Sequence, residues 1–526
     1  MKQLGPEIKI PEKLAPQAEK LFTSDLQALL IRLHHSFEAK RQELLLARKM
    51  RQTKYDAGEV PQYLDKNSVA ASSNWQIAPL PQDLHCRRVE ITGPVNSAKM
   101  VINMLSRNSE GVRADMAMLD FEDSMKPTWN NVLDGYDNVI AAAAGTLQIE
   151  QSGKTYKMNP QDSAHMMVRV RGLHLSESNF KINGQPIAAG LLDLVVCFFH
   201  TAPTLKAQGK TPKYYVPKCE HHLEARWWND LFCELQSALS LPKSTLRVTF
   251  LIETLPAAFQ IEEILYEIRD HAAGLNVGRW DKIFSDIKVL KNHPDRVMAD
   301  RSEINMKKYW MDNYAKRLVQ ICHAHGAFAM GGMSAFTPGK EPEVREKQTE
   351  KVFADKKYEF SIGHDGCWVS HPYFIGYAMK AFPVNNQLAR IERFDKYPDL
   401  LPKGEGPRTI AGLRTNARVG IAYMQGWNDQ LGCVAWDNLM EDLATLEISR
   451  AQTWQWVKHQ VVLQSGEKVT PVLVRKIFTE ELQTILRETN ADLLLTSKFN
   501  KAKEDAERIF LSDTLADFLT NQSEIF

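Results

Sequence analysis

The sequence predicts an α/β protein in which strands and helices alternate along the middle of the chain. Between residues 86 and 395, short apolar runs are separated by longer stretches with helical periodicity. This alternation is typical of parallel strands joined by crossover helices. The apolar runs are Arg88–Gly93, Ala114–Asp123, Ala164–Val170, Tyr214–Cys219, Arg247–Glu253, Gly274–Trp280, Ala327–Met333 and Gly366–Pro372. Roughly eight such runs predict a TIM (β/α)8 barrel. A doubly wound open sheet is the rival, but no Gly-x-Gly-x-x-Gly motif follows the first run.

Residues 1–85 are predicted to form an N-terminal helical arm. Ser24, with Gln27 three residues later, matches a capping box. The apolar residues from Leu26 to Phe37 then recur at helical spacing, and the pattern continues to about Met50. We therefore expect a long helix with one apolar face to bury.

The barrel is predicted to span residues 86–395, with a small hairpin insertion near residues 145–160. A loop rich in Pro and Gly follows, and no further β-rich run is visible beyond it. Residues 396–526 are therefore predicted to form a C-terminal all-helical domain, with breaks at Gly432 and Gly466.

Composition favours a cytoplasmic protein that binds neither nucleic acid nor membrane. The 65 basic and 64 acidic residues leave a net charge of +1, so global charge gives no attraction to nucleic acid. The seven cysteines are scattered without a Cys-x-x-Cys motif, which indicates reduced thiols. No stretch approaches the ~20 apolar residues of a membrane span, and the run Leu191–Phe199 is too short. The N-terminus has no apolar signal segment, and Glu524–Phe526 is not the peroxisomal Ser-Lys-Leu.

Charged residues gather where the predicted strands end, which is where barrel enzymes carry their function. By side-chain alternation Asp120 and Glu122 share a face, as do Arg169 and Arg171. The other charged residues at these ends are Asp123, Lys218, Glu253 and Asp281.

Glu253 and Asp281 are the strongest pair, because they follow consecutive strands and would repel each other without a cation between them. Mg²⁺ fits, since it takes one or two carboxylates and leaves other positions to water and substrate oxygens. The alternative is that each carboxylate caps a helix or pairs with a neighbouring Arg or Lys. That alternative stays open for Asp281 in particular, because Arg279 and Lys282 lie beside it.

Arg169 has two compatible interpretations. It can pair with Asp120 or Glu122, and its planar fork can also stabilise an oxyanion. His364 and Asp365 could form an acid/base pair, although most such glycine-bracketed turns are only tight loops.

Asn438 to Glu441 matches a capping box that would open a long helix. Asp442 would then lie in the first turn. Spacing alone favours a role in complementing the helix dipole there.

Several of these segments together resemble one family. Leu251–Phe259 followed by Arg269–Asp281 closely resembles the malate synthase signature. Asp120–Ser124, Arg169–His174 and Leu439–Thr445 are similar to other segments of that family. The length resembles the shorter isoform, malate synthase A. One departure is Lys282, where the family usually has Tyr.

The resemblance implies an acyltransferase that condenses acetyl-CoA with glyoxylate in the presence of Mg²⁺ and then hydrolyses the thioester, in the glyoxylate cycle. We expect a monomer or a small homo-oligomer. By motif matching, Arg169 and Asp442 would be catalytic, with Asp442 as the base. The other implied residues are Glu253 and Asp281 as metal ligands, Gly278, Arg279, Trp280 and Asp281 as the glyoxylate cradle, and Asp120 and Glu122 as orienting residues. A carbon–carbon lyase of the malyl-CoA or citrate lyase β type is the alternative on a similar barrel.

Overall fold

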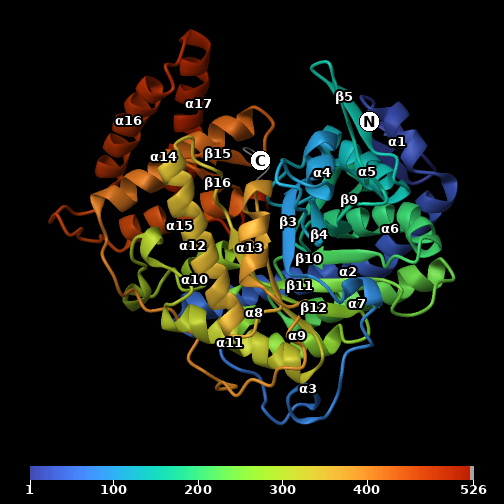
Figure 1. Ribbon diagram of the computed structural model, residues 1–526. Coiled ribbons are helices and arrows are strands. Elements are labelled where there is room, and N and C mark those ends of the chain that lie inside the picture. Colours follow the sequence, from blue (N-terminus) through green and yellow to red (C-terminus); the bar gives the residue numbers. More distant parts are fainter. Residues whose placement is uncertain (522–526) are drawn as a thin grey trace.

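The centre of the molecule is a closed barrel of parallel strands (Figure 1). The computed structural model describes residues 1–521. Residues 522–526, which include the last part of the predicted C-terminal domain and Glu524–Phe526, lie outside the described range. The barrel strands are β3 (Val89–Pro94), β4 (Met116–Asp120), β7 (His165–Arg169), β10 (Lys213–Val216), β11 (Arg247–Ile252), β12 (Ala272–Val277), β13 (Phe328–Ser334) and β14 (Gly366–Val369). Each predicted apolar run overlaps one of these strands, so the TIM barrel is confirmed.

Helices follow most of the strands and surround the barrel, as right-handed crossover connections require (Figure 1). They are α4 (Ala98–Leu105), α5 (Trp129–Ala144), α6 (Ala189–Ala207), α7 (His222–Ala238), α8 (Leu255–Ala258), α9 (Ile261–Glu267), α10 (Arg279–Val289), α11 (Tyr309–Ala324), α12 (Pro342–Ser361) and α13 (Ile375–Ala381). Short 3-10 turns are η1 (Gln82–Leu84), η2 (Pro294–Arg296), η3 (Arg301–Glu303), η4 (Pro372–Phe374) and η5 (Leu519–Asn521).

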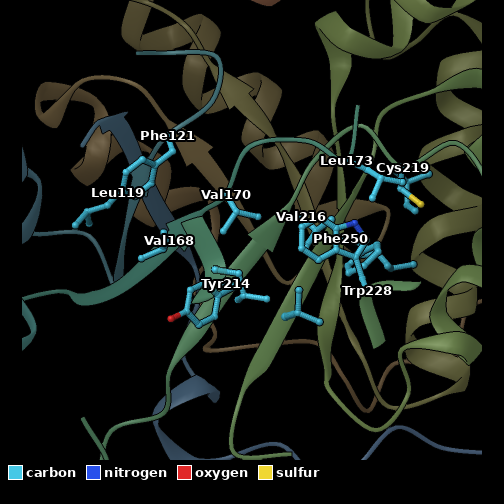
Figure 2. Close-up of a cluster of buried hydrophobic side chains, with 14 of the residues drawn as sticks. Leu119, Phe121, Val168, Val170, Leu173, Tyr214, Val216, Cys219, Trp228 and Phe250 are labelled. Atoms are coloured by element: carbon cyan, nitrogen blue, oxygen red, sulfur yellow. The ribbon is translucent and has the colours of Figure 1, made fainter. Parts of the chain in front are cut away.

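Alternating side chains on each strand divide the core into two layers. Met118 and Tyr215 belong to the cluster that fills the barrel interior. Leu119, Val168 and Val216 belong to the larger cluster between the strands and the surrounding helices, part of which Figure 2 shows. Because both faces of every strand are buried, the strands read in the sequence as continuous apolar runs.

The N-terminal region contains the predicted long helix, α2 (Ser24–Asp56), preceded by α1 (Ala15–Leu21) and followed by α3 (Val69–Ser72). The predicted cap at Ser24 is wrong, since Thr23 is the N-cap and its hydroxyl accepts from the Leu26 amide. A four-stranded antiparallel sheet was also not predicted. It consists of β1 (Lys2–Gln3), β2 (Ile8–Ile10), β8 (Ser176–Ile182) and β9 (Gln185–Ala188).

An antiparallel hairpin, β5 (Gln148–Gln151) and β6 (Lys154–Lys157), lies in the segment where the sequence predicts one. Within residues 1–521, no helix combines the length and apolarity needed to cross a membrane.

The C-terminal region is helical, as predicted, apart from one short hairpin that was not. The hairpin pairs β15 (Val434–Trp436) with β16 (Leu439–Glu441). The helices are α14 (Ile410–Asn428), α15 (Leu443–Lys458), α16 (Pro471–Glu488) and α17 (Leu493–Phe510). They enclose a separate apolar core, while α15 also packs against α10 of the barrel. This contact brings the start of α15 close to the carboxyl ends of the barrel strands.

Candidate active site

A cavity of about 60 Å³ lies between the carboxyl ends of the barrel strands and the start of α15. Two residues predicted for the site, Asp120 and Glu122, do not line it. The predicted residues that do are Arg169, Glu253, Gly278, Arg279, Trp280, Asp281 and Asp442. The structure therefore brings together side chains from sequence positions more than 270 residues apart, Arg169 and Asp442.

Asp120 fixes the orientation of the Arg169 side chain through hydrogen bonds. The two residues are register partners on β4 and β7. Arg169 Nε and Nη2 donate to the two Asp120 oxygens, both at 2.6 Å. Burial would raise the pKa of Asp120, but the Arg169 charge and its hydrogen bonds outweigh burial and hold that pKa below its usual value. Asp120 also accepts from the backbone amides of Glu122 and Ser124, so the pair is fixed in orientation.

Glu122 and Asp123 follow β4 and add negative charge beside Arg169. Glu122 Oε2 lies 3.5 Å from Arg169 Nη1, and Asp123 Oδ2 lies 3.8 Å from it. Burial and the neighbouring Asp123 charge raise the pKa of Glu122 well above its usual value. The sequence placed Asp120 and Glu122 together, and the structure shows both against Arg169.

Lys218 stands at the centre of the carboxylates. Its Nζ lies 2.7 Å from Asp123 and from Asp281, 3.5 Å from Glu122 and 3.7 Å from Glu253. Burial alone would lower the pKa of Lys218, but these charges raise it well above its usual value. From the sequence, Lys218 is expected only at a strand end, and no pattern assigns it a role.

Glu253 and Asp281 both lie close to the Lys218 ammonium, although they come from different elements. Glu253 directly follows β11 and accepts a 2.8 Å hydrogen bond from the Lys218 amide. Burial raises the pKa of Asp281 well above its usual value, and the charges of Glu253 and Asp123 raise it further. The Lys218 charge opposes this increase without cancelling it. Two carboxylates that converge on one cationic group form a hard oxygen donor set, and such a set fits Mg²⁺. Within residues 1–521, no group of three or more His, Cys, Asp or Glu side chains is arranged to hold a metal ion.

The segment from Gly278 to Asp281 is the start of a helix and not the end of a strand. The predicted strand to Trp280 is wrong, since β12 ends at Val277 and Gly278 is the N-cap of α10. A Cβ on Gly278 would come within 2.6 Å of the Glu253 Cβ, so only glycine fits. The first amides of a helix have no intrahelical partner, and a helix start is therefore suited to binding an anion.

Arg279 and Trp280 form one wall of the cavity. The Arg279 guanidinium lies 4.3 Å from the Trp280 ring centroid and donates to the Ile304 carbonyl. Lys282 points elsewhere, because its buried ammonium pairs with Asp286 one turn along α10. The replacement of Tyr by Lys therefore does not put a charge into the cavity.

Asp442 is the N-cap of α15. Its Oδ1 accepts from the Thr445 amide at 3.2 Å, and the Thr445 hydroxyl accepts from the Asp442 amide. The predicted cap at Asn438 is wrong: Asp437 and Asn438 both have positive φ and form the two-residue turn between β15 and β16. Burial and the Asp123 charge raise the pKa of Asp442 to about 7.

Three other residues considered in the sequence do not line this cavity. Arg171 pairs with Asp193 and Glu177. His364 and Asp365 precede β14, at the amino end of the barrel, where Asp365 accepts from the Ala329 amide at 2.8 Å. They are therefore not an acid/base pair in this site.

Comparison with known proteins gives matches over almost the whole chain. Family models match residues 7–68 (malate synthase, N-terminal domain), 165–398 (malate synthase, TIM barrel domain) and 407–524 (malate synthase, C-terminal). Malate synthase A of Escherichia coli strain K12 is 41% identical over 98% of this chain and 97% of its own length. The chain belongs to the malate synthase family.

Other members of the family match over almost the same span. The malate synthase of Myxococcus xanthus strain DK1622 is 42% identical over 98% of this chain and 96% of its own length. The glyoxysomal malate synthase of Candida tropicalis is 38% identical over 98% of this chain and 94% of its own length. The family read from the sequence motifs is confirmed, and with it the acyltransferase class.

Proposed function

We propose that the protein catalyses the Mg²⁺-dependent condensation of acetyl-CoA with glyoxylate, followed by hydrolysis of the thioester to malate and CoA, as a step of the glyoxylate cycle. One observation carries the proposal: Arg169, the carboxylates Glu253 and Asp281, and Asp442 line the same cavity. Together they supply a base, an oxyanion donor and a metal site, and this condensation needs all three.

Asp442 is proposed as the base that removes a proton from the acetyl methyl group. A base acts best when its pKa lies near the operating pH, and the Asp442 pKa of about 7 meets that condition. The capping hydrogen bonds with Thr445 hold the carboxylate in one orientation. The helix-dipole interpretation from the sequence is compatible with this, since the N-cap position fixes the side chain that does the chemistry.

Arg169 is proposed to stabilise the enolate oxygen that forms when the methyl proton leaves. A thioester methyl is a very weak carbon acid, so the negative charge of the enolate needs a preorganised donor. Asp120 engages Nε and Nη2, Nη1 lies 3.5 Å from Glu122 Oε2, and the Arg169 side chain as a whole lines the cavity. Asp120 and Glu122 are thus proposed as orienting residues.

Glu253 and Asp281 are proposed to hold Mg²⁺, which when bound would polarise the glyoxylate aldehyde and so favour attack on its carbon. The first amides of α10, from Arg279 to Asp281, are proposed to bind the glyoxylate carboxylate. The protein groups thereby orient the aldehyde carbon toward the nucleophile.

Acetyl-CoA is proposed to enter through a neighbouring cavity of about 500 Å³. This cavity, here called the entry cavity, shares Thr92, Ser370 and Met440 with the active site. Pro372 lines it, and so does Arg107, which pairs with Asp162 and is proposed to attract a phosphate group. A long ligand in this position would present its acetyl end between the barrel and Asp442.

One assay tests the function and separates it from a carbon–carbon lyase. Acetyl-CoA, glyoxylate and Mg²⁺ are mixed with the protein, and free thiol and malate are followed. Free CoA with malate supports the synthase, whereas accumulated malyl-CoA without free thiol would favour the lyase. We also infer a cytoplasmic monomer or small homo-oligomer, and the free state of all seven cysteines supports a reducing compartment.

A further inference from the structure

A second cavity, of about 10 Å³, touches the active site. It shares Asp123 and Asp281 with the active-site cavity, and Lys218 also lines it. Its volume is close to the space that one water molecule needs. We call it the small cavity.

A much larger hollow beside α2 shares wall residues with the small cavity. The hollow has a volume of about 950 Å³ and is open to solvent, since Leu46 on its α2 wall is 58% exposed. Both cavities are lined by His174, Leu175 and Thr520. The three cavities are therefore neighbours through shared wall residues, with the open hollow on one side and the carboxylates around Lys218 on the other.

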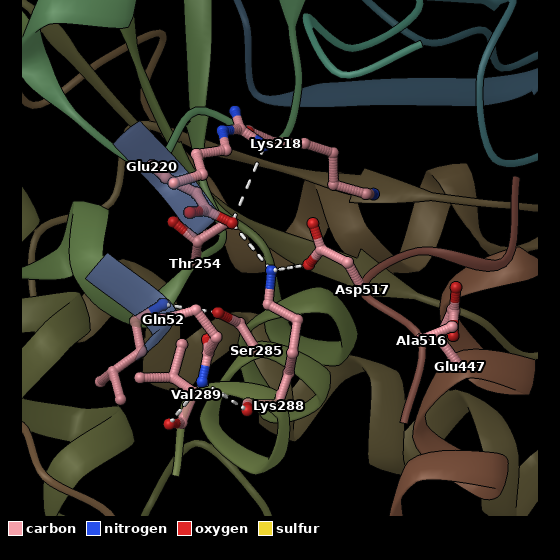
Figure 3. Close-up of polar contacts among 12 residues, drawn as sticks. Gln52, Lys218, Glu220, Thr254, Ser285, Lys288, Val289, Glu447, Ala516 and Asp517 are labelled. Atoms are coloured by element: carbon pink, nitrogen blue, oxygen red, sulfur yellow. Dashed lines mark hydrogen bonds and ion pairs between the residues drawn. The ribbon is translucent and has the colours of Figure 1, made fainter. Parts of the chain in front are cut away.

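The C-terminal segment 515–521 forms one wall of the hollow and of the small cavity. Asp517 pairs with Lys288, which in turn donates to Glu220 at 2.8 Å (Figure 3). The Phe518 ring stacks on His174 with centroids 4.2 Å apart. The Leu519 amide donates to Glu447 at 2.7 Å. These contacts fix the segment against α10, α15 and the loop that follows β7.

Polar atoms without hydrogen-bond partners line the small cavity. Among the described residues, His174 Nδ1 and Glu122 Oε2 are buried and have no such partner. Buried polar groups of this kind are usually satisfied by water when there is room for it. The small cavity therefore fits a water molecule better than it fits an apolar group.

The proposed reaction creates a need for such a route. After condensation the site holds malyl-CoA, whose CoA part would fill the entry cavity. Hydrolysis then needs one water: its oxygen adds to the thioester carbonyl carbon, the carbon–sulfur bond breaks, and malate, the CoA thiol and one proton result. The water must reach the carbonyl by a way that CoA does not block.

We propose that the small cavity is the passage that delivers the hydrolytic water, with the segment 515–521 as its wall. The proposal rests on the proposed function and adds to it a separate path for the second half of the reaction. Under this proposal Thr520 lines the passage, because it borders both the small cavity and the open hollow. It does not line the active-site cavity.

The test narrows the passage at Thr520. Thr520→Phe is expected to slow hydrolysis by roughly tenfold, while the condensation step keeps its wild-type rate. Rapid-quench single turnovers with labelled acetyl-CoA measure both steps, because malyl-CoA should accumulate before free CoA appears. Thr514→Phe is the matched control, since Thr514 is exposed, directly precedes the segment 515–521 and lines none of the three cavities.

The outcomes separate the two proposals. If Thr520→Phe and Thr514→Phe hydrolyse malyl-CoA at the same rate, water does not use this passage. If the wild-type protein forms neither malyl-CoA nor malate, the proposed function itself is wrong. Thermal melts of each variant check folding, and Thr520→Leu repeats the test with a smaller obstruction. An equal slowing of condensation and hydrolysis would also overturn the proposal, because it would indicate a distorted site.

Discussion

Asp120 and Arg169 face each other across two neighbouring barrel strands, and the carboxylate receives both of its guanidinium hydrogen bonds at 2.6 Å. The geometry is bidentate, so it fixes the plane of the guanidinium as well as its position. Lysine carries the same charge but cannot reproduce this fork.

The first prediction follows from this pair. Arg169→Lys should lower kcat by roughly 10²–10³, the usual cost of losing one oxyanion donor. Arg88→Lys is the matched control, because Arg88 makes a similar two-pronged contact with Asp115 at the amino end of the barrel. Steady-state kinetics on both variants measure the effect. Near wild-type turnover in Arg169→Lys would show that another group stabilises the enolate.

The second prediction concerns the metal ligands. Glu253→Gln and Asp281→Asn should each weaken Mg²⁺ binding and glyoxylate binding together, because each removes one anionic ligand from the pair. Isothermal titration calorimetry with Mg²⁺, and then with glyoxylate, measures this. Asp286→Asn serves as the control, since Asp286 lies on the same helix but pairs with Lys282. Full activity of the wild type in excess chelator would contradict the metal site.

The third prediction concerns Lys218, which neutralises the carboxylates around it when no metal is bound. Lys218→Met should lower the Tm of the metal-free protein, because buried carboxylates then repel each other without a counter-charge. Added Mg²⁺ should restore more of the Tm than it does in the wild type. Lys213→Met is the control, since Lys213 is a buried lysine at the other end of β10, paired with Asp83. An equal response of the two variants to Mg²⁺ would argue against this role.

The barrel could be predicted from the sequence because its strands are buried on both faces. Burial makes each strand a continuous apolar run, and the charged residues after each run then stand out. The same reasoning led to Arg169, Glu253 and Asp281. Sequence patterns did not predict the N-terminal sheet, because its strands are short and pair with distant segments. β1 and β2 have only two and three residues, and so short a segment carries no signal of a partner strand near residue 180.

Local conformation accounts for the other errors. Asn438 looked like a helix cap, since Asn is favoured there, but the same residue also suits positive φ in a hairpin turn. Lys218 has a φ of 55°, a left-handed conformation that is uncommon outside glycine. Its backbone amide meets Glu253 and its ammonium lies among four carboxylates. No sequence pattern marks that conformation, so the centre of the charge cluster could not be seen in advance.

The fourth prediction is a pH dependence of the first chemical step. Asp442 must be ionised to accept a proton, and its pKa is raised to about 7 by burial and by Asp123, against the opposing charges of Arg169 and Lys218. The value of kcat/KM for acetyl-CoA should therefore rise as pH increases through about 7 and level off above it. A profile that is flat from pH 6 to 8 would show that another group limits this step.

The last prediction separates the two roles of Asp442, as a helix cap and as a base. Asn is as good an N-cap as Asp, so Asp442→Asn should keep α15 intact. The sign of the stability change follows from the raised pKa. The native state binds the Asp442 proton more tightly than the unfolded state does, so ionised Asp442 costs stability as pH rises from about 4 through 7. At pH 8 the Asn variant should therefore have the same Tm as the wild type or a higher one.

The catalytic rate of Asp442→Asn, unlike its Tm, should fall. Loss of the base should slow condensation by roughly 10²–10⁴, whereas hydrolysis of supplied malyl-CoA, which needs no enolate, should fall less. Exchange of deuterium into the acetyl methyl group, measured with a non-reacting glyoxylate analogue, reports proton removal directly. Asp492→Asn is the control, since Asp492 caps α17 through the Leu495 amide and does not line the active-site cavity. Wild-type exchange in Asp442→Asn would exclude Asp442 as the base. A lower Tm together with intact exchange would leave it only the structural role that spacing alone favours, so the two measurements decide between a cap and a base.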